Sequence, residues 1–225
     1  MKMKCLSHIV LAALMVSSAS ASAGVVMGGT RIVYPENKKE VAFSVSNREG
    51  VKPYLIQSWV EGDVQNNKNA APFIVTPPLF RLDPDQTNML RIQYTGAPLP
   101  KDRESVFWLD VKAIAPKPKE GDNELQVNIK SKFKIFYRPE HLAGDPATAW
   151  EKLTFTRSGK GLKATNPTPY YVSFYSLKVA GKEIADPGMI APGQSREWPV
   201  AASGSVTWSA INDFGGVTNT HSQPL

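Results

Sequence analysis

Two carboxylates close together are the feature of this sequence most able to do acid–base chemistry. Asp83 and Asp85 flank Pro84 in the segment LDPDQ, and paired carboxyl groups can act as general acid and general base. In a turn of this composition, aspartates more often accept hydrogen bonds from nearby backbone N–H groups. We favour the turn interpretation. A hydrolase that uses Asp83 and Asp85 stays as an alternative, ranked third behind the two binding functions described below.

The sequence offers little for a metal, thiol or phosphate site. Its only cysteine, Cys5, lies in an N-terminal segment that we expect to be removed. His141 and His221 have no cysteine to join them, so zinc would lack most of its usual four ligands. The sequence also has no Gly-x-Ser-x-Gly, phosphate-loop or dinucleotide-binding motif. We therefore expect no metal, no cofactor and no enzymatic activity.

Residues 1–23 have the form of a cleavable secretion signal. A basic start and a short apolar run over residues 9–16 precede Ala21-Ser22-Ala23, which fits a small-residue cleavage site. The apolar run is too short to span a bilayer, and no later run is long enough to anchor the chain. We expect cleavage after Ala23 and a soluble, exported protein.

The size and charge of the remaining chain narrow its class. About 200 residues remain after cleavage, which suits two β-sandwich domains of about 100 residues each. Loss of Lys2 and Lys4 takes the net charge from +6 to +4. This excess is mild and dispersed, whereas a nucleic-acid site is denser and interleaved with aromatics, so we expect no nucleic-acid partner.

The elements that must position any site are strands. From Gly24 onward, short runs of alternating apolar and polar residues are separated by turn residues, a pattern typical of an all-β sandwich. Thr76-Pro77-Pro78 interrupts this pattern and favours a cis bond at one of its two prolines. We predict two immunoglobulin-like β-sandwiches with a cleft between them: an N-terminal domain over residues 24–140, a linker over 141–148 and a C-terminal domain over 149–225.

One predicted strand, Leu125 to Pro139, is unusually long. Every second residue from Leu125 is apolar except Ser131, and Lys130, Lys132 and Lys134 form a stripe on the other face. At about 3.3 Å per residue the strand would run about 40 Å, which is about twice the usual length. Its first apolar residues, Leu125, Val127 and Ile129, then either face their own core or are supplied to an incomplete sheet of another protein.

A second hypothesis is a secreted adhesin or carbohydrate-binding module. Its sugar-stacking platforms would be tryptophans, although tryptophans within alternating strands more often belong to a core. The candidates are Trp59, Trp108, Trp198 and Trp208.

Five motifs, in order along the chain, resemble those of one family. The residues are Thr30-Arg31-Ile32-Val33-Tyr34, Leu99 to Ser105 (LPKDRES), Lys134 to Pro139 (KIFYRP), Asn166 to Tyr171 (NPTPYY) and Ile211 to Gly216 (INDFGG). Together they resemble the periplasmic pilus chaperones, the PapD-like family of the chaperone–usher pathway. The short polar connection before the long strand and the absence of cysteine from the mature chain are similar to the short-loop branch of that family.

The resemblance implies a function and partners. Such chaperones bind a fimbrial subunit that lacks its last strand, supply that strand from the segment matched by Leu125, Val127 and Ile129, and release the subunit at the outer-membrane usher. An exposed strand of this kind also offers a surface for self-association of the free chaperone.

The resemblance also implies roles for two groups of charged residues. Arg31 and Lys134 match the pair that holds the subunit's C-terminal carboxylate, and such a grip would fix the register of the supplied strand. Glu104, Arg138 and Asp213 match an ionic network between the domains, in which one arginine between two carboxylates would fix the cleft angle.

Overall fold

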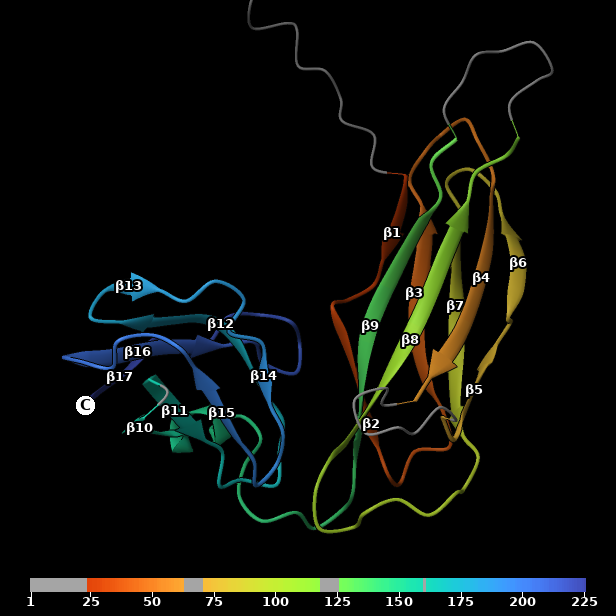
Figure 1. Cartoon of the computed structure of the whole chain (residues 1–225). Helices are drawn as coiled ribbons and strands as arrows, with labels where there is room; N and C mark the ends of the chain where they lie inside the picture. Colours follow the sequence, from red (N-terminus) through yellow and green to blue (C-terminus); the bar gives the residue numbers. More distant parts are fainter. Residues whose placement is uncertain (1–23, 63–70, 118–125, 160) are drawn as a thin grey trace, which may run out of the picture.

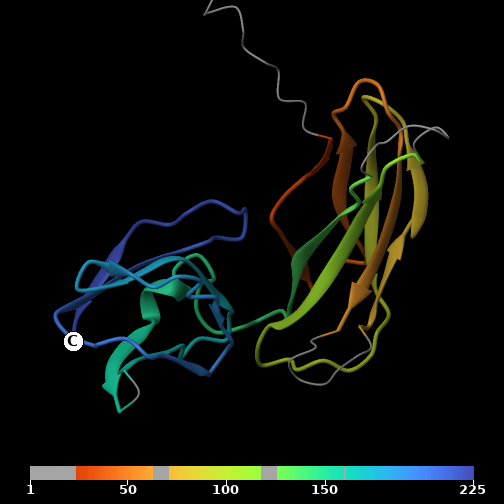
Figure 2. The ribbon, with the colours of Figure 1, turned by 45° about the horizontal axis from the view of Figure 1, so that its top comes forward.

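The computed structural model describes residues 24–62, 71–117, 126–159 and 161–225. They form two β-sandwiches, each with its own buried core, set at an angle and joined by one chain segment after the end of the long strand (Figures 1 and 2). This arrangement confirms the predicted all-β, two-sandwich architecture. The predicted secretion signal, its cleavage site and Leu125 lie outside the described residues.

The N-terminal sandwich contains nine strands in the described part of the chain: β1 (Val25–Met27), β2 (Arg31–Pro35), β3 (Val41–Asn47), β4 (Tyr54–Glu61), β5 (Phe73–Thr76), β6 (Leu79–Leu82), β7 (Thr87–Tyr94), β8 (Ser105–Ile114) and β9 (Ile129–Arg138). One sheet has the order β1-β3-β7-β5 and the other β2-β9-β8-β4-β6. The β2–β9 pair is parallel. The cis bond predicted near the paired prolines is Thr76–Pro77.

The chain changes sheets between β1 and β2. β1 pairs with β3 in one sheet, and β2 pairs with β9 in the other. A Cβ atom at Gly28 would collide with the hydroxyl of Ser44, so glycine is needed where the chain passes this close to β3. The crossing places Arg31, the first residue of β2, beside β9.

β9 begins later than the alternating pattern predicts. Its pairing with β8 starts at Ile129, opposite Ala113, and residues 126–128 lie outside any strand. β8 ends at Ile114, so a longer β9 would have no partner for its backbone groups on that side. The sequence pattern therefore continued past the end of the sheet, and the predicted strand of Leu125 to Pro139 is too long.

The two faces of β9 differ as predicted. Ile135 and Tyr137 are buried in the core between the sheets. Lys130, Lys132 and Lys134 alternate with them and therefore lie on the outer face of the sheet.

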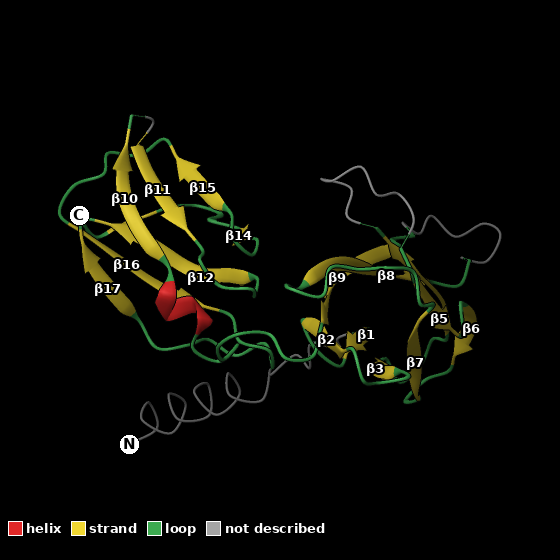
Figure 3. Cartoon of the chain, turned by 90° about the horizontal axis from the view of Figure 1, so that it is seen from below, coloured by secondary structure: helices red, strands yellow, loops and turns green. Residues whose placement is uncertain are grey.

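The C-terminal sandwich begins with a short 3₁₀ helix, η2 (Ala149–Lys152), drawn red in Figure 3. Its strands are β10 (Thr154–Ser158), β11 (Gly161–Thr165), β12 (Val172–Val179), β13 (Lys182–Glu183), β14 (Met189–Ile190), β15 (Ser195–Trp198), β16 (Ser205–Ala210) and β17 (His221–Pro224). One sheet has the order β10-β11-β15, and the other β13-β12-β16-β17 with β14 also paired to β12.

β17 is a strand that the sequence pattern does not predict. It pairs antiparallel with β16. The imidazole of His221 lies 4.9 Å from the Trp208 ring, centroid to centroid. The segment HSQP has no apolar alternation, so its pairing was not visible in the pattern.

Candidate functional site

The apolar residues before and at the start of β9 point into solvent. Val127 is 61% exposed and Ile129 is 63% exposed. Gln126 and Asn128, on either side of Val127, turn instead toward Ala115, the residue after β8. Gln126 Nε2 donates to the Ala115 carbonyl at 2.6 Å, and the Ala115 N–H donates to Asn128 Oδ1 at 3.2 Å. Val127 and Ile129 are therefore outside the core of their own domain.

Two cations stand side by side midway along β9. Arg31 on β2 is the register partner of Lys134 on β9. The neighbouring pair, Ile32 and Ile135, is buried, so Arg31 and Lys134 both project from the outer face. Arg31 Nη1 donates to the Ile211 carbonyl of the second domain at 2.8 Å.

Neither cation forms a direct ion pair with a carboxylate among the described residues, although Asp213 and Glu104 act on Arg31, and Asp186 on Lys134, from a greater distance. Burial lowers the pKa of Arg31, and burial together with the charge of Arg31 lowers the pKa of Lys134. Arg31 Nε is buried without a hydrogen-bond partner. Two half-buried cations with spare donors form a site that favours an anion.

An aromatic ring lies beside each cation. The Arg31 guanidinium carbon is 5.7 Å from the centre of the Phe136 ring, and Lys134 Nζ is 5.2 Å from the centre of the Trp108 ring. Trp108 is the register partner of Lys134 on β8. Both separations fall within the range of cation–π attraction.

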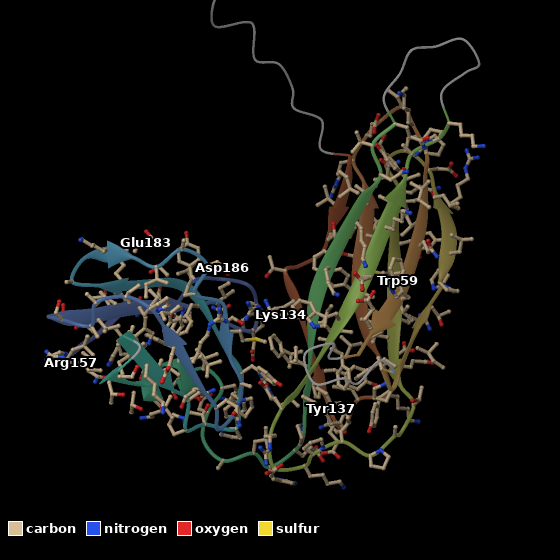
Figure 4. The ribbon with its side chains drawn as sticks, in the orientation of Figure 1. Trp59, Lys134, Tyr137, Arg157, Glu183 and Asp186 are labelled. Carbon is tan, nitrogen blue, oxygen red and sulfur yellow. The ribbon has the colours of Figure 1, made fainter. Side chains whose placement is uncertain are left out.

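A cleft between the domains opens next to this pair. Its volume is about 810 Å³, and it is lined from the first domain by Val106, Trp108 and Lys134 and from the second by residues that include Tyr171, Ser173, Asp186 and Met189. Figure 4 shows Lys134 and Asp186 on opposite sides of the gap. A segment of another protein that entered the cleft would meet both domains at once.

The three charged residues predicted to connect the domains do meet. Arg138 Nε donates to Glu104 Oε1 at 2.6 Å, and its two Nη atoms donate to the carboxylate of Asp213 at 2.7 and 2.9 Å. Glu104 is only 3% exposed, and its second oxygen accepts the N–H of Tyr171 at 2.7 Å. Burial alone would lower the pKa of Arg138, but Asp213 and Glu104 raise it above its ordinary value.

The loop after β16 aims Asp213 at this arginine. Asn212 Oδ1 accepts the N–H groups of Phe214 and Gly216 at 3.0 and 2.9 Å. Gly215 has a φ of 84°, in the region that favours glycine. The INDFGG motif therefore forms a tight turn whose acidic residue faces the first domain.

The other candidate residues have structural roles or lie apart. Asp83 pairs with Arg81 at 2.6 Å, and Asp85 has the positive φ of a turn residue, 58°. Trp198 and Trp208 are buried in the second core, whereas Trp59 and Trp108 lie on the outer face of the first domain. In the part of the chain that the structure covers, no cluster of ligand side chains could hold a metal ion. No helix in those same ranges is long and apolar enough to cross a membrane.

Three contributors to the site were missed by sequence reasoning. They are Trp108 beside Lys134, the Ile211 carbonyl that Arg31 contacts, and the Tyr171 N–H that binds Glu104. The NPTPYY and INDFGG motifs contained the last two, but a backbone contact leaves no signal in residue type. Trp108 could be placed beside Lys134 only once the register of β8 and β9 was known.

Known proteins similar to this chain fall in one family. Residues 24–143 match the family model "Pili and flagellar-assembly chaperone, PapD N-terminal domain", and residues 148–222 match "Pili assembly chaperone PapD, C-terminal domain". The chain is 44% identical over 224 residues to the chaperone protein FimB/FhaD of Bordetella pertussis, covering 92% of this chain and 91% of the relative. It is 42% identical over 218 residues to the chaperone protein FimC of Escherichia coli, covering 95% and 89%.

Solved chaperone structures are also similar to this chain over most of its length. A chain of the Salmonella enterica SafA pilin–SafB chaperone complex matches with a TM-score of 0.82 at 34% identity, covering 90% of this chain and 96% of that one. The Escherichia coli chaperone DraB matches with a TM-score of 0.78 at 39% identity, covering 90% and 97%. The two-sandwich fold and both family models place the chain in the class of pilus-assembly chaperones. The chain belongs to the PapD-like family of pilus-assembly chaperones, which confirms the resemblance seen in its five motifs.

Proposed function

We propose that this protein is a periplasmic chaperone that binds fimbrial subunits by supplying a strand to them and delivers them to an outer-membrane usher. The exposed pair Val127 and Ile129 carries this proposal, because soluble proteins avoid apolar residues at an unprotected strand end. Leu125 would extend the same apolar row. Residues 1–23 would direct export, with cleavage after Ala23. The role needs no catalysis and no cofactor.

The supplied segment would act by β-strand addition. Backbone pairing to the subunit gives general affinity, and alternate side chains that fill the subunit's open groove give specificity. Burial of each apolar side chain contributes about 1.5–3 kcal/mol before the cost of association. This mode suits a client whose own sheet is incomplete.

Arg31 and Lys134 would bind the terminal carboxylate of the subunit. Every subunit carries this group at a fixed distance from its last residue, so a grip on it sets the register of the added strand. Register matters because a slip of one residue turns every apolar side chain to the wrong face. The network of Glu104, Arg138 and Asp213 would hold the two walls of the cleft at the angle that this grip needs.

Co-expression with fimbrial subunits tests the proposal. We expect Lys134→Ala to reduce the recovery of subunit complexes from periplasm by at least about 30-fold, since loss of one partner of a desolvated charge pair costs about 2–5 kcal/mol. Lys112→Ala, a lysine on the same sheet face but outside the cleft, is the matched control and should bind normally. Normal recovery with a folded Lys134→Ala variant would contradict the proposed grip.

A further inference from the structure

Lys134 makes no direct ion pair with any described residue of the free cleft, and the nearest acidic influence on it is Asp186 on the opposite wall, whose charge raises the pKa of Lys134 but does not outweigh burial and Arg31, which lower it. In the described chain this lysine has no ion pair and no side-chain hydrogen bond, and it lies next to the positive charge of Arg31. A flexible ammonium under such repulsion would ordinarily move away from its neighbour. The group that lies against it is the indole ring of Trp108, at 5.2 Å.

Trp108 is itself held in a network on the outer face. Lys132 Nζ lies 5.4 Å from the same ring centre, and Glu61 fixes that lysine at 2.6 Å. Lys130 is bound at 3.0 Å to Asp110, a carboxylate with no exposed side-chain surface. Lys130 and Lys132, earlier in β9, therefore have carboxylates in direct contact, whereas the group in contact with Lys134 is the ring of Trp108.

We propose that Trp108 is a positioning residue that holds Lys134 ready to bind the subunit's terminal carboxylate. This inference rests on the proposed function. A carboxylate in the place of Trp108 would neutralise Lys134 and would have to be displaced by the client. An aromatic face attracts the ammonium through its quadrupole and leaves the charge available to an incoming anion. The ring thus lowers the ordering cost of binding without competing for the site.

The test uses two synthetic probes, a peptide of alternating valine and threonine with a free C-terminal carboxylate and the same peptide with a C-terminal amide. The full chaperone should bind the acid form more tightly than the amide form, and Lys134→Ala should remove this preference. Trp108→Leu should reduce the acid-to-amide affinity ratio about five-fold, because a cation–π contact of about 1 kcal/mol corresponds to that factor. Trp108→Phe, which keeps a ring face, should retain most of the ratio.

Two controls separate positioning from a structural effect. Trp59→Leu removes a tryptophan that contacts Lys130 at 4.9 Å on the same face but away from the cleft, and it should leave the ratio unchanged. Progressively fluorinated tryptophan placed at position 108 keeps the ring's shape and weakens its negative face, so the ratio should fall in steps. In the Lys134→Ala background, none of these changes should alter the ratio further.

The outcomes distinguish the two proposals. Equal binding of acid and amide by the wild-type protein would overturn the carboxylate grip and this inference with it. A preference that depends on Lys134 but is unchanged by fluorination and by Trp108→Leu would leave the grip intact and overturn the role of Trp108. A ratio that Trp59→Leu lowers as much as Trp108→Leu would likewise contradict positioning.

Discussion

At the scale of single residues, Arg138 matters most to the relation between the domains. Its guanidinium binds a buried carboxylate of one domain and a half-exposed carboxylate of the other. Taking charges out of water is costly, so such a network gives specific geometry more reliably than it gives stability. We therefore infer that Arg138 fixes how Glu104 and Asp213 face each other.

Removal of Arg138 should destabilise the protein, because a buried carboxylate would lose its charged partner. We expect Arg138→Met to lower the free energy of unfolding by about 3–5 kcal/mol, because Glu104 is left buried and charged without its partner. Urea denaturation measures the loss. Adding Glu104→Gln to Arg138→Met should recover much of it, whereas Asp213→Asn alone should have a smaller effect because Asp213 is partly exposed. A double variant no more stable than Arg138→Met would contradict this account.

At the scale of elements, the outer face of β4, β8 and β9 is ordered by charge as well as by strand pairing. Glu61 on β4 binds Lys132 and Lys130 on β9 across the intervening β8. The hydrogen bond from Lys132, followed by that from Trp59, lowers the pKa of Glu61 from 4.5 to about 2. Asp110, buried beneath these lysines, has its pKa raised by burial.

The depressed pKa of Glu61 predicts a pH dependence. A carboxyl group whose pKa is lower in the folded state stabilises the fold above its unfolded pKa, and this contribution is lost as pH falls through the folded value. Between pH 4.5 and about 2, the wild-type protein should therefore lose stability that Glu61→Gln never had. Urea unfolding of both proteins at pH 7 and pH 3 measures the difference, which should narrow at pH 3. A constant difference would show that Glu61 is not stabilised by these lysines.

The long strand shows what the sequence could and could not predict at this scale. Its two-residue alternation located β9 and separated the buried Ile135 and Tyr137 from the lysine face, because core and solvent impose opposite residue types. The pattern did not reveal where β9 begins, because the apolar alternation continues through Val127 and Ile129, which are exposed rather than buried in the core. β17 escaped notice for the converse reason: its backbone pairs while its side chains stay polar.

At the scale of the whole molecule, the sequence predicted the two sandwiches and the charged residues between them. It did not predict the strand register and the aromatic contacts that orient Arg31 and Lys134. Arg31, Lys134, Glu104, Arg138 and Asp213 lie in four of the five motifs that carry the family resemblance. The structure adds that Arg31 and Lys134 are register partners and that they lie against aromatic rings. Parallel pairing of β2 with β9 joins segments about 100 residues apart, and no local pattern encodes such a pairing.

The central claim is that the segment around Val127 and Ile129 enters the client. A photo-crosslinking amino acid at position 129, in chaperone co-expressed with a subunit that co-purifies from periplasm, tests it most directly. We predict a crosslink to the subunit from position 129, and none from position 79, where Leu79 is similarly exposed at 55% on the far edge of the same sheet. A stable complex that crosslinks from position 79 and not from position 129 would contradict the account.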